Sequence, residues 1–160
     1  MEIKPFTDGY LWNRFVETQN PWSFFQSWEW GEVHRKIDNE IIRWGFYDRG
    51  NLIGIAQIIL IKAKRGTFLH IRHGPVFLKN DHQHWTLFLE KIRSLGKERG
   101  CDFVRVSPML ENSLENQKFL MTLGFNSSAI HRMDGENCWI LDLGKNEEEI
   151  LAGMRKTTRY

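Results

Sequence analysis

The chain has 160 residues, of which 41% are hydrophobic and 26% charged, with a formal net charge of +2. This balance is typical of a globular protein and argues against general disorder, and so small a net charge gives no strong field for nucleic acid. No apolar run approaches the roughly 18 residues of a membrane span, no secretory signal is visible, and the two cysteines stand in no ligand spacing, so a cytoplasmic protein is expected.

The first third of the chain predicts two short helices. Thr7 or Asp8 can cap a helix that ends near Thr18, just before an Asn-Pro pair that breaks it. Ser27 is an N-cap for a second helix over residues 28–36, whose first turn carries a favourable acid.

Strands are predicted next. Residues 42–47 and 52–61 flank Asp48-Arg49-Gly50-Asn51, a sequence well suited to a hairpin turn. The second strand reads LIGIAQIIL and is apolar on both faces, which predicts a central strand covered by helices on both sides. Residues 68–71 form a further strand, which His73-Gly74-Pro75 ends.

The remaining elements complete one α/β domain over residues 1–160. They are a helix from Asn80 or Asp81 to about Lys97, a strand over 101–106, a helix from Ser113 to Gly124, a strand over 139–143, and a final helix that Asn146 caps. This order predicts an N-acetyltransferase-like (GNAT-like) fold with a mixed, mostly antiparallel sheet flanked by helices.

Several kinds of site are disfavoured by the sequence. The six histidines reproduce no metal-ligand spacing, and neither a GxSxG nor an activated cysteine is present. The phosphate loops GxxxxGK[ST] and GxGxxG are also missing, as is the [QR]xxGx[GA] loop that an acetyl-CoA enzyme with this sheet normally carries. No metal and no cofactor is therefore expected, and coenzyme A binding is disfavoured.

Two basic segments leave alternatives open. Trp30 and His34 lie four apart, so one helical face presents an aromatic ring and then a hydrogen-bond donor, which suits a flat anionic ligand such as a nucleotide. The alternative is a helix with its aromatics in the core and its basic end solvated. The run from Arg155 to Tyr160 either contacts phosphates of RNA or of a precursor, or is an ordinary charged helix end.

Short motifs in a fixed order resemble the FemABX family, the peptidoglycan interpeptide-bridge aminoacyltransferases of the "methicillin resistance protein" type. They are FQSWEWGE (25–32), NLIGIAQ (51–57), RHGPVF (72–77), FVRV (103–106), LGF (123–125), and WILDL (139–143) followed by MRKTTRY (154–160). Each motif alone is weak, but their shared order across nearly the whole chain is specific.

The resemblance implies a function in cell-wall synthesis. Such enzymes have two GNAT-like domains and add an amino acid from aminoacyl-tRNA, rather than from coenzyme A, to the peptide stem of a UDP-linked or lipid-linked muramyl pentapeptide. Residues 1–160 would be the first domain, with the second domain absent, and aminoacyl-tRNA would bind through that second domain.

In the family the helix carries a basic residue four positions after the tryptophan that binds the precursor, so the resemblance implies this role for His34, where a lysine is more usual. We expect precursor contacts at four residues: His34 and Lys36 would engage phosphates, Arg72 would lie on a groove wall before the Gly74-Pro75 turn, and Arg105 would be a further contact. No general base is assigned. The alternatives are an acetyl-CoA-dependent N-acyltransferase and a truncated, non-catalytic binding domain.

Overall fold

The computed structural model describes residues 1–64, 66–128 and 141–159. The chain divides into two compact units, Met1–Ser127 and Ser128–Tyr160. The reading of residues 1–160 as a single domain therefore stays a prediction. The first unit contains these elements in order: β1 Glu2–Pro5, α1 Gly9–Glu17, the 3-10 helix η1 Phe24–Gln26, α2 Trp28–Lys36, β2 Glu40–Asp48, β3 Asn51–Ala63, β4 Gly66–Arg72, β5 Val76–Phe77, α3 His82–Glu98, β6 Phe103–Ser107 and α4 Leu114–Thr122.

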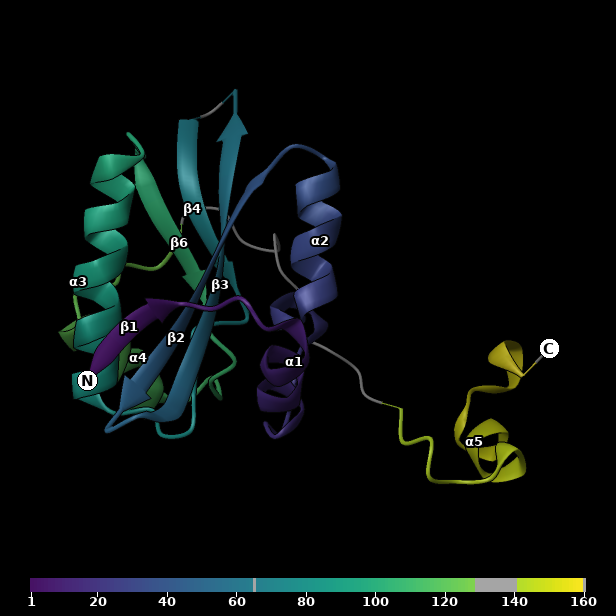
Figure 1. Cartoon of the computed structure of the whole chain (residues 1–160). Coiled ribbons are helices and arrows are strands. Elements are labelled where there is room, and N and C mark those ends of the chain that lie inside the picture. The colour runs from purple at the N-terminus through teal and green to yellow at the C-terminus, as the bar shows by residue number, and fades with distance from the viewer. Residues whose placement is uncertain (65, 129–140, 160) are drawn as a thin grey trace. The chain divides into compact units, whose positions relative to one another are not determined.

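A six-stranded sheet forms the centre of this unit (Figure 1). Its strand order is β1-β2-β3-β4-β6, and β5 pairs with β3. Only the β4–β6 pair is parallel, and the other pairings are antiparallel. The mostly antiparallel α/β fold predicted from the sequence is thus confirmed. Short β1, short β5 and η1 are elements that the sequence did not predict.

Helices cover both faces of the sheet, as the apolar sequence of β3 predicts. On one face α3 packs Trp85, Phe88 and Ile92 against strand residues such as Phe46 and Ile58. On the other face α1 forms a second cluster, composed of Phe6, Trp12, Phe15, Val16 and Ile55. Figure 1 shows α1 and α2 on one side of the sheet and α3 and α4 on the other.

Local sequence signals set the ends of these elements. The side chains of four predicted caps, Asp8, Ser27, Asp81 and Ser113, each accept a hydrogen bond from a backbone N–H three residues on. The β2–β3 hairpin turns through two residues with positive φ, Arg49 at 48° and Gly50 at 82°, as a tight primed turn requires.

The second unit contains α5 Glu147–Gly153 and the 3-10 helix η2 Lys156–Thr158. Asn146 caps α5 in a capping box with Glu149, as predicted. The predicted strand over 139–143 begins outside the described residues, and its described part, 141–143, is not a strand. The reason is local, because the Asp142 carboxylate accepts the Gly144 N–H at 2.9 Å and stabilises a turn there.

Among the described residues, no helix has the length and apolar character that crossing a membrane requires. The same part of the chain holds no group of three or more His, Cys, Asp or Glu side chains placed to bind a metal ion.

Candidate functional site

Four side chains form a basic-aromatic cluster between α2 and the end of β4: Phe25, Trp30, His34 and Arg72. The ring centroids of Trp30 and His34 are 4.9 Å apart, and those of Phe25 and Trp30 are 5.1 Å apart. The Arg72 guanidinium lies 3.8 Å from the Phe25 centroid and 5.6 Å from that of Trp30. The predicted aromatic and basic face of α2 therefore points toward a third group, Arg72, from the sheet.

The indole nitrogen of Trp30 is buried and has no hydrogen-bond partner in the part of the chain that the structure describes. Buried polar atoms are nearly always paired, because an unpaired one costs roughly 1–3 kcal/mol. An N–H donor beside a guanidinium is complementary to an oxygen atom that carries negative charge.

The electrostatics of the cluster act on His34. Burial lowers the pKa of this imidazole below its ordinary value of 6.5, and the positive charges of Arg72 and His70 lower it further. The ring is therefore neutral at pH 7. Its Nδ1 lies 3.0 Å from the side-chain nitrogen of Asn39, which fixes the ring's orientation.

Arg105, another predicted contact, lies on the strand next to β4. In the parallel β4–β6 pair, His70 is opposite Arg105 and Arg72 is opposite Ser107, so these four side chains belong to one face of the sheet. This is the face that α2 covers. The structure thus brings His34 and Arg72 together and places Arg105 on the same face.

Lys36 is not part of this arrangement. It is exposed and lies two residues after His34 on α2, so the two side chains leave the helix on different sides. The helix geometry therefore disfavours direct contact of His34 and Lys36 with the same phosphate. Lys36 still adds positive charge to the end of α2.

A buried polar network holds η1 and the start of α2 on the sheet. Gln57 donates to the Ser27 carbonyl oxygen at 2.9 Å and accepts from Arg43 Nε at 2.8 Å. Its backbone N–H donates to the side chain of Gln26 at 3.0 Å. Arg43 also pairs with Glu32 at 3.0 Å. Both glutamines are 1% exposed, so the network fixes the segment that carries Phe25 and Trp30.

Sequence reasoning missed this network, although one signal was present. Gln57 is the single polar residue inside the apolar run LIGIAQIIL, and a buried polar residue in a central strand needs partners. The partner Gln26 could not be identified from the sequence, because it lies 31 positions away.

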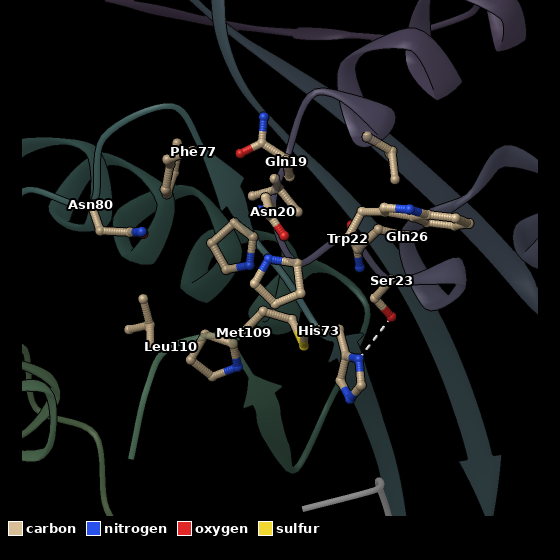
Figure 2. Close-up of a pocket in the computed structure, with 15 residues that line it drawn as sticks. Gln19, Asn20, Trp22, Ser23, Gln26, His73, Phe77, Asn80, Met109 and Leu110 are labelled. Carbon is tan, nitrogen blue, oxygen red and sulfur yellow. Dashed lines mark hydrogen bonds between the residues drawn. The ribbon is translucent and has the colours of Figure 1, made fainter. Parts of the chain in front are cut away.

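Sequence reasoning also missed a pocket next to the cluster, with a volume of about 130 Å³ (Figure 2). Ser23 Oγ and His73 Nδ1 are 2.7 Å apart at one end of it. Asn80 and Leu110 lie at the opposite end in Figure 2.

The start of α3 is poorly suited to the pyrophosphate of coenzyme A. A helix N-terminus attracts phosphate, but here the Asp81 carboxylate already accepts the His84 N–H at 3.0 Å. A phosphate at this position would meet a negative charge.

Solved structures share this fold. One described as FemX has a TM-score of 0.70 at 20% identity, over 79% of this chain and 32% of that chain, so the present chain spans about a third of its length. Aminoglycoside acetyltransferase AAC(6')-Iy in complex with a bisubstrate analogue has a TM-score of 0.57 at 15% identity, over 86% and 98% of the two chains. Glucosamine-6-phosphate N-acetyltransferase from Arabidopsis thaliana has a TM-score of 0.56 at 15% identity, over 85% and 98%.

The neighbours confirm the predicted N-acetyltransferase-like fold. Comparison with curated protein sequences gives no match. The model of the FemAB family, however, matches residues 11–135, a region that contains most of α1, all of α2, the whole of the sheet except β1, and every residue of the basic-aromatic cluster. The chain belongs to the FemAB family.

Proposed function

We propose that this chain is part of a cytoplasmic aminoacyltransferase that adds an amino acid to the peptide stem of a peptidoglycan precursor. In this proposal the unit 1–127 binds the UDP-linked or lipid-linked muramyl pentapeptide. Aminoacyl-tRNA supplies the amino acid and engages a second domain of the same fold. Membership of the FemAB family supports this assignment, as does the fold that the chain shares with FemX.

The observation that carries the proposal is the basic-aromatic cluster, in which the Trp30 indole N–H has no hydrogen-bond partner among the described residues. The Arg72 guanidinium presents planar donors that match phosphate oxygens, and the indole N–H adds another donor beside it. A bound phosphate would also favour protonation of His34, which would then supply a second cation. We assign the precursor's pyrophosphate to this cluster, with Arg105 and Lys36 as outer positive groups.

The proposed reaction requires little acid-base or nucleophilic catalysis by side chains. The acceptor amine attacks the carbonyl carbon of the aminoacyl ester, a new amide bond forms, and the terminal ribose oxygen of the tRNA leaves with a proton. Because the ester is already activated, correct positioning of amine and carbonyl provides much of the rate. The role of this unit is to hold one end of the acceptor.

An acetyl-CoA-dependent N-acyltransferase is the second candidate, because several structural neighbours are described as acetyltransferases. The Asp81 carboxylate at the N-terminus of α3 argues against it. The missing pyrophosphate loop between β4 and α3 argues in the same direction.

A ligand titration followed by ¹H–¹⁵N NMR tests the proposal. UDP-muramyl pentapeptide should shift the indole resonance of Trp30 and the backbone resonances of residues 30–36, and acetyl-CoA should not. The substitution Arg72→Gln should weaken the precursor's effect, while Arg14→Gln, at an exposed position of α1, is the matched control. Absence of any shift at residues 30–36 at saturating precursor would overturn the proposal.

A further inference from the structure

The pocket beside the cluster lies at the edge of the sheet where β4 and β6 both end (Figure 2). These strands are parallel, so their carboxyl ends meet at one edge. His73 and Pro75 after β4 form one wall, residues 108–110 after β6 form a second, and the loop 19–23 between α1 and η1 forms a third. A crevice outside the carboxyl ends of strands is a common ligand position in α/β proteins.

The charge of this pocket differs from that of the basic-aromatic cluster. No Lys, Arg, Asp or Glu is among the described residues that line it, and His73 is the one ionisable side chain among them. Val16, Pro75 and Phe77 provide apolar surface. A phosphate or carboxylate would find no permanent cation here, so a neutral ligand fits better.

Two side-chain amides offer hydrogen-bonding groups that the described part of the chain leaves unused. Asn20 makes no side-chain hydrogen bond there. The oxygen of Asn80 accepts from Trp85 Nε1 at 3.2 Å, whereas its amide nitrogen donates to no described residue. These groups pair well with peptide C=O and N–H groups, which carry the same donors and acceptors.

The wall around His73 is held rigidly before any ligand binds. Ser23 Oγ is 2.7 Å from His73 Nδ1, and the Phe25 ring meets the imidazole edge-on at 4.8 Å. Gly74 packs so closely on the buried Gln26 side chain that a Cβ at this position would lie 2.7 Å from Gln26 Cδ. A preformed wall reduces the ordering cost of binding.

Size limits what the pocket can hold. Its volume of about 130 Å³ is well below the roughly 300–1,000 Å³ of sites for drug-sized ligands. A nucleotide or a sugar is therefore too large, whereas one small side chain with its adjoining peptide groups fits.

We propose that the pocket is a peptide subsite, which binds an uncharged, extended segment with a small apolar side chain such as that of alanine. The side chain packs against Pro75 and Phe77, and the flanking peptide groups bond to the amides of Asn20 and Asn80. The identity of the segment rests on the proposed function, in which it belongs to the peptide stem of the acceptor.

A neutral peptide provides the test. N-acetyl-tri-alanine amide is titrated into the ¹⁵N-labelled 160-residue chain. We expect shifts of the side-chain amides of Asn20 and Asn80 and of the indole of Trp22, which is 57% exposed at the rim. The resonance of the Trp30 indole should not shift.

A substitution then tests the proposed hydrogen bond. Asn20→Ala should raise the Kd of the peptide roughly fivefold, which corresponds to the loss of about one hydrogen bond. Asn126→Ala, at an exposed position, is the matched control.

Titration with UDP-muramyl pentapeptide beside the neutral peptide separates this inference from the proposed function. If UDP-muramyl pentapeptide shifts Trp30 while neither it nor the neutral peptide affects the pocket resonances, the peptide subsite is wrong and the proposed function stands. If the neutral peptide binds in the pocket while the precursor leaves Trp30 unchanged, the subsite stands and the proposed function fails. No saturable shift at Asn20, Trp22 or Asn80 with the peptide overturns the inference.

Discussion

The side-chain amide of Gln26 donates a hydrogen bond of 2.6 Å to the carbonyl oxygen of Arg72 and thereby joins η1 to the end of β4. The same side chain accepts the backbone N–H of Gln57 at 3.0 Å. Gln26 is 1% exposed, so both bonds are shielded from water. Gln26 therefore holds the backbone of η1, which carries Phe25, next to the backbone of Arg72.

Gln26→Leu should destabilise the fold. Leucine has a similar volume but no hydrogen-bonding groups, so the Gln57 N–H and the Arg72 carbonyl each lose a buried partner. We expect a loss of roughly 2–4 kcal/mol in the free energy of unfolding, measured by urea denaturation. Gln117→Leu, on the exposed side of α4, is the control and should stay within about 0.5 kcal/mol of the parent chain. Equal stability of the two variants would contradict a structural role for Gln26.

A pair of glycine substitutions tests how closely α2 packs on the polar network. A methyl group at Gly31 would overlap the Arg43 guanidinium and the Gln57 side-chain oxygen, whereas one at Gly96 of α3 would meet Val104 at an ordinary 3.6 Å. Gly31→Ala should therefore cost about 1–3 kcal/mol in thermal or urea unfolding. Gly96→Ala should be neutral or stabilising, because alanine favours a helix more than glycine does. Similar effects at both sites would mean that α2 can move away from the sheet.

Local signals made most of the fold predictable, and the absence of local signals explains what was missed. The caps Asp8, Ser27 and Asp81 act on N–H groups only three residues away, so short stretches of sequence identify the helix starts. The four-residue strand β1 and the two-residue strand β5 instead form because they pair with longer strands, which no local pattern reveals.

Less of the basic-aromatic cluster was predictable, because only part of it depends on residues that are close in the sequence. Trp30 and His34 share a helical face, and their contact follows from spacing alone. The approach of Arg72 depends on how β4 pairs with β3 and on the Gln26–Arg72 bond, which spans 46 positions. Arg72 was expected as a precursor contact, but only the tertiary structure shows that its guanidinium meets the aromatic rings. The different side on which Lys36 leaves α2, by contrast, follows from its spacing of two residues from His34.

The depressed pKa of His34 predicts how stability depends on pH. In the unfolded chain this imidazole titrates near 6.5, whereas burial, Arg72 and His70 lower its pKa in the folded chain. Above pH 6.5 both states are neutral at this residue and the stability is unaffected. As pH falls below 6.5 the unfolded chain takes up more protons, so stability is lost until the folded-state pKa is reached.

His34→Gln should remove this part of the pH dependence, measured as the free energy of unfolding between pH 7.5 and 5. The same substitution at an exposed position of α3, His82→Gln, is the control for the general effect of replacing histidine by glutamine. An unchanged slope in His34→Gln would show that its surroundings do not disfavour the charged form.

Two cation substitutions distinguish the groups proposed to bind the precursor. Arg72→Gln removes a guanidinium that lies over the Phe25 ring, and the loss of a charge-assisted hydrogen bond to phosphate should raise the Kd for UDP-muramyl pentapeptide by roughly tenfold or more. Lys36→Gln removes only an exposed, partly screened charge, so its effect should stay within about threefold. Isothermal calorimetry at fixed ionic strength measures both. A larger effect at Lys36 than at Arg72 would place the phosphates on the other side of α2.

His34→Lys should strengthen precursor binding at pH 7.5 and reduce its dependence on pH. In the parent chain the imidazole is neutral at this pH, and protonation coupled to phosphate binding makes affinity rise as pH falls. A lysine carries its charge before the ligand arrives and reaches the space above Trp30 on a flexible stem. The Kd of His34→Lys should therefore be lower than that of the parent at pH 7.5, and the two should approach each other as pH falls. Arg72 lies close enough to repel the new ammonium, so the variant should also be less stable without ligand and regain stability with it. A Kd that is unchanged at pH 7.5 in a folded variant would mean that position 34 does not face the phosphates.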